Sequence, residues 1–159
     1  MKTLIVYYSR SGVTRTVAEA LGQSLKADVE EIRPTGDYRG IAGWMRAGKD
    51  ATFGRSVDIE PSAVNPADYD MVVIGSPVWA FTMASPVRTW LAAYGGATRR
   101  AAFFCTMGGS GDKRTFAHME KLCGKKPSAT MTLIDKDVRK GKLAPMDYFV
   151  TSLLQAAAT

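Results

Sequence analysis

The sequence predicts an α/β fold, in which an open, doubly wound sheet of five parallel strands carries helices on both faces. Short apolar runs alternate with helical patterns along the chain, which is typical of βαβ units. The 159 residues suit a single domain over residues 1–159, because domains usually run to about 100–200 residues. Hydrophobic residues make up 46% and charged residues 23%, a balance that favours a packed core over disorder.

Five segments have the composition of strands, and they are Lys2 to Tyr8, Val29 to Arg33, Met71 to Gly75, Ala101 to Thr106, and Ala129 to Ile134. The first, third and fourth are continuous apolar runs, as expected of strands covered on both faces. The second contains Glu30 and Glu31, and the fifth alternates threonines with apolar residues, so these two resemble edge strands. These differences predict the strand order 2-1-3-4-5. An order that begins 3-2-1 would place the apolar third strand at an edge.

Four helices are predicted from apolar residues that recur every three or four positions. Ser85 is expected to cap the second helix, and Pro86 suits its first turn. Glycines are expected to end the second and third helices, at Gly95-Gly96 and at Gly124. The apolar stripes are Val13, Val17, Leu21 and Leu25; Val87, Trp90, Leu91 and Tyr94; Phe116, Met119, Leu122 and Cys123; and, after Pro145, Met146, Phe149, Val150, Leu153 and Leu154.

A long connection, Pro34 to Tyr69, joins the second and third strands. Seven glycines or prolines lie between residues 34 and 61. Ile41, Trp44 and Met45 in its middle predict a short amphipathic helix rather than a linker between domains.

The charge distribution narrows the range of partners. The net charge is +6, but residues 1–80 carry nine basic and ten acidic side chains, whereas residues 81–159 carry twelve basic and five acidic ones. The basic clusters are separated by apolar segments and form no known nucleic-acid-binding motif, so nucleic acid is not an expected partner. We interpret them as solvated faces of helices and loops.

Targeting and metal-binding signals are absent from the sequence. No apolar run approaches the roughly 18–20 residues that cross a bilayer, and Leu4 to Tyr8 is too short for the core of a signal peptide. We therefore expect a cytoplasmic protein that does not bind membranes. Cys105 and Cys123 do not form a Cys-x-x-Cys pair, and one histidine leaves too few ligands for zinc, so no metal is expected.

The loop after the first strand has the composition of a phosphate site. In an open parallel sheet, ligands bind beyond the carboxyl ends of the strands. This loop leads directly into a helix, whose first N–H groups carry partial positive charge and suit a phosphate. The same composition is also found in simple turns with a helix cap. The candidate residues are Ser9, Arg10, Ser11, Gly12, Val13 and Thr14.

The loops after the third and fourth strands end at the same edge. One contains two large aromatic residues and the other is rich in glycine, so together with the first loop they predict a site for a flat, phosphorylated, heteroaromatic ligand. The alternative is that Trp79 and Phe81 only pack on the next helix and that the glycine-rich loop is a connector. The candidate residues are Pro77, Val78, Trp79, Ala80 and Phe81, then Thr106, Gly108, Gly109 and Ser110.

Two stretches, Tyr8 to Arg15 and Gly75 to Leu91, carry a resemblance to the flavodoxin-like FMN-binding family. The first resembles the family's phosphate loop, and the second is similar to the flavin-ring loop and following helix of its short bacterial members. The resemblance implies a flavodoxin-like fold and FMN as the cofactor. It also implies that residues 9–14 hold the phosphate, residues 77–81 line the isoalloxazine edge, and residues 106–110 contact the pyrimidine side of the ring.

This chain lacks the residues that two other classes of protein with a similar scaffold require. A response-regulator receiver needs acidic residues near the end of the first strand, where this chain has Tyr7, Tyr8 and Ser9. A low-molecular-weight tyrosine phosphatase needs Cys-x5-Arg, but Gly111 and Ala129 occupy the sixth positions after the two cysteines.

Two departures from electron-carrying flavodoxins bear on function. This chain is basic where those proteins are usually acidic, and Gly108-Gly109 stands where they commonly place a tyrosine over the flavin. The first hypothesis is therefore a small FMN-dependent oxidoreductase that uses NAD(P)H or a quinone, with the flavin carrying the chemistry and no catalytic side chain assigned. The alternatives are an electron-transfer flavodoxin that docks on acidic redox proteins and, third, a flavin-free interaction domain.

Overall fold

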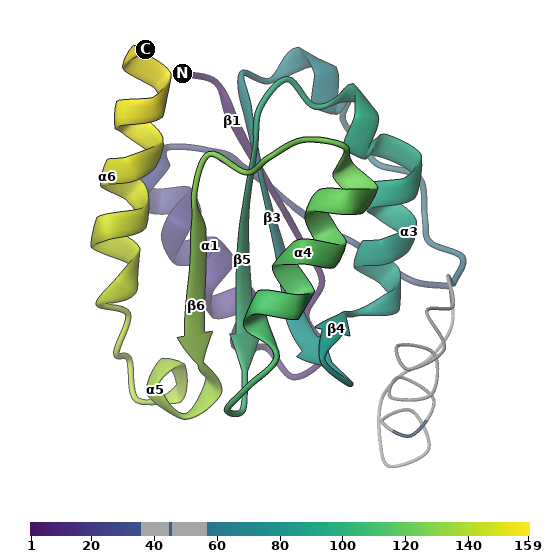
Figure 1. Cartoon of the computed structure of the whole chain (residues 1–159), viewed down its shortest axis with the longest axis vertical. Helices are drawn as coiled ribbons and strands as arrows, with labels where there is room; N and C mark the ends of the chain where they lie inside the picture. Colours follow the sequence, from purple (N-terminus) through teal and green to yellow (C-terminus); the bar gives the residue numbers. More distant parts are fainter. Residues whose placement is uncertain (36–44, 46–56) are drawn as a thin grey trace.

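The computed structural model describes residues 1–35, 45 and 57–159. A central sheet lies between two layers of helices, and the carboxyl ends of its parallel strands share one edge (Figure 1). The strand order is β2-β1-β3-β5-β6, and these five strands are parallel. This confirms the predicted order and fold class. The strands are β1 (Thr3–Tyr7), β2 (Asp28–Glu31), β3 (Met71–Trp79), β4 (Thr82–Met83), β5 (Ala101–Met107) and β6 (Thr130–Ile134).

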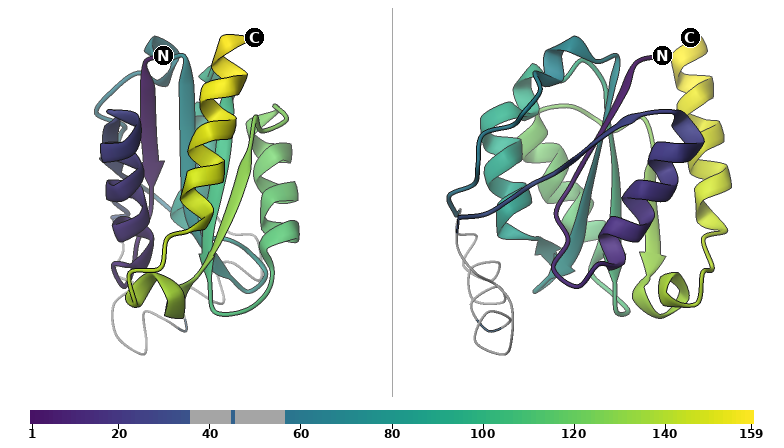
Figure 2. Two further views of the ribbon diagram at one scale, coloured as in Figure 1. Left: turned by 90° about the vertical axis from the view of Figure 1, so that its left-hand side faces the viewer. Right: turned by 180° about the vertical axis from the view of Figure 1, so that it is seen from behind.

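Helices cover both faces of the sheet (Figure 2). Helices α1 and α6 lie on one face and α3 and α4 on the other. The helices are α1 (Val13–Leu25), α3 (Ser85–Tyr94), α4 (Asp112–Cys123), α5 (Asp135–Arg139) and α6 (Pro145–Ala158), with short 3-10 turns at Pro66–Asp68 and Gly95–Ala97. Among the described residues, none of these helices has the length and apolar character needed to span a membrane.

Alternation along the central strands builds two hydrophobic cores. Leu4 and Val6 of β1 pack with α3 and α4, while Ile5 packs with α1 and α6. In β5, Phe103 belongs to the first core and Phe104 to the second. Successive strand residues point to opposite faces, so a continuous apolar run is needed to fill both cores.

Gly75 is required by close packing between β3 and β5. It pairs with Phe104 in the parallel register. A Cβ atom at position 75 would lie 2.1 Å from Cζ of Phe104, which would force the ring out of its place. The aromatic ring therefore covers the glycine directly, and this contact packs one core just before the carboxyl edge of the sheet.

Several element boundaries differ from the predictions. Strand β3 continues to Trp79 and turns back into the short antiparallel strand β4, so residues 77–79 belong to a strand rather than a loop. The prediction that Ser85 caps α3 was wrong, because Ala84 is the N-cap and its N–H donates to Oγ of Ser76. Helix α5 was not predicted. Its five residues are too few to show an apolar repeat.

The two arms of the long connection pair with each other where they leave the sheet. The N–H of Thr35 donates to the carbonyl of Asp58 at 3.0 Å, and the N–H of Glu60 donates to the carbonyl of Arg33 at 2.8 Å. The predicted short helix around Ile41 and Trp44 falls outside the described residues.

Candidate functional site

A pocket of about 130 Å³ opens at the carboxyl edge of the sheet, between the start of α1 and the end of β3. Eight of the fifteen candidate residues line it, so the structure brings together parts of all three predicted segments. Asp135, at the carboxyl end of β6, was not predicted. The lining residues are Arg10, Ser11, Val13, Thr14, Pro77, Val78, Trp79, Thr106 and Asp135.

The start of α1 is arranged as an anion site. Gly12 is the N-cap with φ of 94°, a left-handed conformation that glycine adopts without strain. Its N–H donates to Oγ of Ser9 at 3.0 Å, so Ser9 orders the loop from a buried position. No side chain caps the helix, and its first turn contains no acidic residue. The first N–H groups are therefore left to a ligand or water.

A buried hydrogen bond joins the first and third predicted segments. The hydroxyl oxygens of Thr14 and Thr106 lie 2.8 Å apart, and either group can donate. Both side chains are buried, and they come from α1 and β5. A satisfied polar contact of this kind holds the base of the pocket in one geometry.

The aromatic side of the pocket, formed by Trp79, is followed directly by a strained turn. Trp79 packs edge-to-face on Tyr8, with ring centroids 5.3 Å apart. After Trp79, Ala80 and Phe81 adopt φ of 47° and 64° to form a two-residue hairpin turn into β4. Two adjacent non-glycine residues with positive φ are costly, and such strain concentrates at functional sites. Phe81 is 56% exposed beside the pocket and does not line it.

The glycine-rich segment after β5 leaves the pocket open. Gly108, Gly109 and Ser110 are exposed and do not line the pocket. Added Cβ atoms at the two glycines would meet nothing within 4 Å. Gly111, by contrast, packs against the hairpin, because a Cβ there would lie 2.9 Å from Cγ1 of Val78.

Asp135 brings a carboxyl group to the pocket wall. It is half-buried, and burial raises its pKa from the ordinary 3.8, while the charge of Arg139 opposes this shift. A carboxylate that loses its charge more readily is easier to place near an anion. The rule that selected the other segments also applies to Asp135, because it directly follows a strand at the same edge.

Cys105 is the cysteine that lies on a strand ending at this edge. Cys105 on β5 is buried, and burial raises the pKa of its thiol to about 12, so it stays protonated at neutral pH. Within the described part of the chain, no group of three or more His, Cys, Asp or Glu side chains is placed to hold a metal ion.

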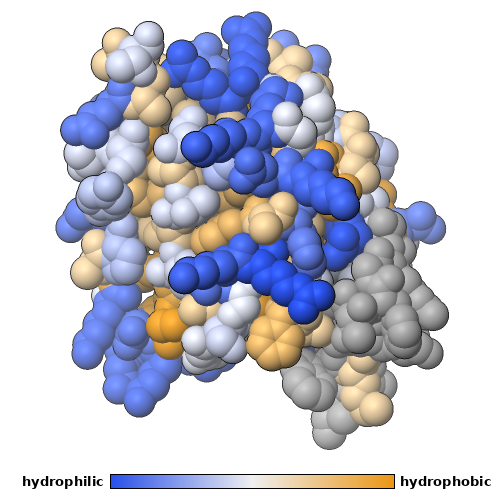
Figure 3. All heavy atoms as spheres, in the orientation of Figure 1, coloured by the Kyte–Doolittle hydropathy of each residue, from blue (hydrophilic) through white to orange (hydrophobic). Residues whose placement is uncertain are grey.

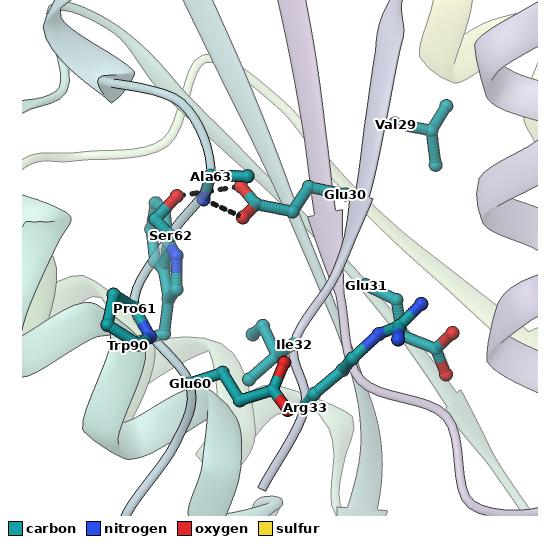
Figure 4. Close-up of a pocket in the computed structure, with 10 residues that line it drawn as sticks. All are labelled: Val29, Glu30, Glu31, Ile32, Arg33, Glu60, Pro61, Ser62, Ala63 and Trp90. Carbon is teal, nitrogen blue, oxygen red and sulfur yellow. Dashed lines mark hydrogen bonds between the residues drawn. The ribbon is translucent and has the colours of Figure 1, made fainter.

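A second pocket, of about 320 Å³, lies beside the edge strand β2 (Figure 4) and shares no lining residue with the first. Its wall contains the carboxylate of Glu30, which accepts hydrogen bonds from Oγ of Ser62 and the N–H of Ala63. Glu31 pairs with Arg15. Glu30 thus binds residues 62–63 to β2, and Glu31 binds helix α1 to β2. The negative charge of the two carboxylates does not suit a phosphate.

The chain belongs to the flavodoxin family, because the family's sequence model matches residues 2–146. A flavoprotein from Lactobacillus acidophilus NCFM, solved in complex with FMN, is 29% identical over 87% of this chain and 97% of that one, with a TM-score of 0.72. Flavodoxin 1 from Bacillus cereus is 14% identical over 98% of each chain, with a TM-score of 0.57, and is similar in fold. No curated protein matches the sequence significantly.

Proposed function

We propose that this chain binds FMN noncovalently at the carboxyl edge of the sheet and acts as a small oxidoreductase that uses NAD(P)H or a quinone. The observation that carries FMN binding is the start of α1, which faces the pocket without a side-chain cap or an acidic residue. Membership of the flavodoxin family and the FMN complex of the relative from Lactobacillus acidophilus support the same cofactor.

The residues present fit the phosphate end of FMN. The N–H groups of the first helical turn, the Ser11 hydroxyl and the Arg10 guanidinium can all donate to phosphate oxygens. The pocket of about 130 Å³ is smaller than the roughly 300 Å³ at which sites for whole drug-sized ligands begin. It therefore suits the phosphate end, while Trp79 at its wall is placed to meet the ring.

The bound flavin would supply electron and hydride transfer, and the chain would position it. Hydride transfer needs the two reacting groups in near contact, so one face of the ring must accept a second flat molecule. The exposed Gly108, Gly109 and Ser110 supply no large side chain to cover that face. This open loop favours an enzyme over a simple carrier.

An electron-transfer flavodoxin is the second candidate. The exposed Phe81 beside the pocket offers an apolar contact for a protein partner. The excess of basic residues in the second half of the sequence would favour an acidic redox protein as that partner. For either role we propose a cytoplasmic location, because both cysteines are free and buried, as is common in a reducing compartment.

Anaerobic mixing of the FMN-loaded protein with NADPH or NADH tests the proposal. We expect the flavin absorption to bleach rapidly with at least one nucleotide. Failure of FMN to bind would contradict the cofactor assignment. Binding without bleaching by either nucleotide or by a reduced quinone, together with reduction in two resolved one-electron steps, would instead favour the electron-transfer role.

A further inference from the structure

Three polar side chains from three elements meet behind the β3–β4 hairpin. The guanidinium of Arg88 on α3 donates from Nη2 to Oγ1 of Thr82 on β4 at 3.2 Å. Oγ1 of Thr82 also lies 2.7 Å from Nδ1 of His118 on α4. The Thr82 hydroxyl accepts from the guanidinium and has a proton and a second lone pair left, so it either donates to Nδ1 or accepts from it, according to the tautomer of His118. When it donates, the neutral imidazole carries its proton on Nε2.

This cluster carries an excess of positive charge. Arg114 and Lys121 on α4 both act electrostatically on His118, together with Arg88. Nε of Arg88 is buried without a hydrogen-bond partner, and Arg88 makes no ion pair with a carboxylate in the described part of the chain. Hydrophilic side chains gather over α4 on this face of the molecule (Figure 3). The terminal nitrogens of a half-buried guanidinium that has no carboxylate partner among the described residues are suited to an incoming anion.

The cluster lies next to the candidate flavin site. Thr82 stands opposite Trp79 in the antiparallel register of the hairpin, and Trp79 lines the pocket at the carboxyl edge. An extended molecule that stacks at the pocket could therefore reach Arg88 by passing over the hairpin.

We propose that Arg88, His118 and Thr82 form a binding site for a phosphate monoester group carried by the second substrate of the flavin. This proposal rests on the proposed function. The guanidinium would donate two hydrogen bonds to the phosphate and Nε2 of His118 would donate a third. The chemistry is common to free phosphate and to the 2′-phosphate that distinguishes NADPH from NADH, and we assign the site to the nucleotide.

His118 is the only histidine in the sequence, so its imidazole signal in an NMR titration reports on the site without ambiguity. Burial lowers the pKa of His118, and Arg114, Arg88 and Lys121 lower it further. A bound phosphate dianion should counter these charges and raise the pKa by about one unit. The probes are 2′-AMP, 5′-AMP and inorganic phosphate, added to the full chain.

Arg88→Gln is the diagnostic variant, and Arg99→Gln is its control. Arg99 is exposed and close to Asp70, so its replacement removes the same charge at a different place. We expect 2′-AMP to raise the His118 pKa in the parent and in Arg99→Gln, and about tenfold weaker binding in Arg88→Gln. If Arg88→Gln does not fold, Arg114→Gln with Lys121→Gln replaces it, with the same expected weakening.

The outcomes separate this proposal from the proposed function. No shift of the His118 pKa with any probe, or an equal shift in Arg88→Gln, overturns the phosphate site. Equal affinity for 2′-AMP, 5′-AMP and inorganic phosphate overturns the nucleotide assignment. In the anaerobic assay, Arg88→Gln should raise about tenfold the NADPH concentration that gives half of the maximal bleaching rate, and leave that concentration unchanged for NADH. Absence of bleaching in the parent would contradict the proposed function, while the NMR result would still decide whether the cluster binds phosphate.

Discussion

Gly12 is the residue on which phosphate binding is expected to depend most directly. Its φ of 94° strains any residue other than glycine, Asn and Asp least, while a Cβ there would meet nothing within 4 Å. Gly12→Asp should therefore fold but weaken FMN binding by about 1–4 kcal/mol, because its carboxylate would repel the phosphate. Fluorescence titration with FMN measures the effect. Gly12→Asn has the same shape without the charge, and equal losses in both variants would show that charge is not the cause.

Removal of the Asp135 charge is expected to strengthen FMN binding, whereas the added charge in Gly12→Asp should weaken it. The pKa of Asp135 is higher in the folded state than its ordinary value of 3.8. The protonated carboxyl therefore adds to the stability of the folded protein below pH 3.8, and this contribution is lost as the pH rises through the folded-state pKa. Above its folded-state pKa, where Asp135 is ionised, its charge opposes both folding and phosphate binding. Asp135→Asn should therefore tighten FMN binding by about fivefold at pH 7, the equivalent of about 1 kcal/mol.

The pH dependence provides the check on Asp135. In the parent, FMN affinity should rise as pH falls through the Asp135 pKa, whereas the variant should lack this component. The phosphate itself titrates in both proteins, so the difference between the two titration curves is the measured quantity. Weaker binding by Asp135→Asn at pH 7 would mean that the carboxylate orders the site.

The strained turn of the β3–β4 hairpin is expected to lower the stability of the protein. Ala80 has φ of 47°, and a non-glycine residue in this region costs about 1–2 kcal/mol. Ala80→Gly should relieve part of that strain and stabilise the protein by about 0.5–1 kcal/mol, after the greater chain entropy of glycine is counted. Thermal unfolding should then shift upward by about 1–4 °C.

Ala92→Gly is the matched control for the hairpin. Ala92 is exposed on α3, so the same substitution there should destabilise the protein by about 0.5–1 kcal/mol. A loss of stability in both variants would indicate that the hairpin turn carries no relievable strain.

The charge of the whole molecule leads to a prediction about kinetics. With a net charge of +6 concentrated in residues 81–159, the encounter with an anionic nucleotide should be accelerated electrostatically. Stopped-flow bleaching by NADPH should slow several-fold between about 0.01 M and 0.1 M salt, as the Debye length falls from about 30 to about 10 Å. Reoxidation by an uncharged quinone should not change. An equal effect of salt on both reactions would point to a general effect on the protein.

The sheet could be predicted from the sequence because its signals are local to each strand. Uniform apolar runs marked the buried strands, and Glu30 with Glu31 marked an edge. The β3–β4 hairpin could not be predicted, because Ala80 and Phe81 lack the Asn-Gly type of signal for a two-residue turn. Its positive φ values are those that a two-residue turn between antiparallel strands requires.

The candidate site was predictable in outline but not in detail. Strand ends of a parallel sheet converge on one edge, and this rule located eight of the lining residues. The Thr14–Thr106 hydrogen bond joins positions 92 residues apart, and no local pattern indicates which hydroxyls meet. The cluster of Thr82, Arg88 and His118 could not be predicted for the same reason, because no local sequence pattern indicates that these three side chains meet.

The paired arms at residues 33–35 and 58–60 have a consequence for how this protein can evolve or be redesigned. Because hydrogen bonds close the connection at its base, the chain between the arms starts and ends at the same place whatever its length. Closing a longer loop costs only about 0.6 kcal/mol for each doubling. Insertions between the arms are therefore expected to leave the register of the sheet unchanged.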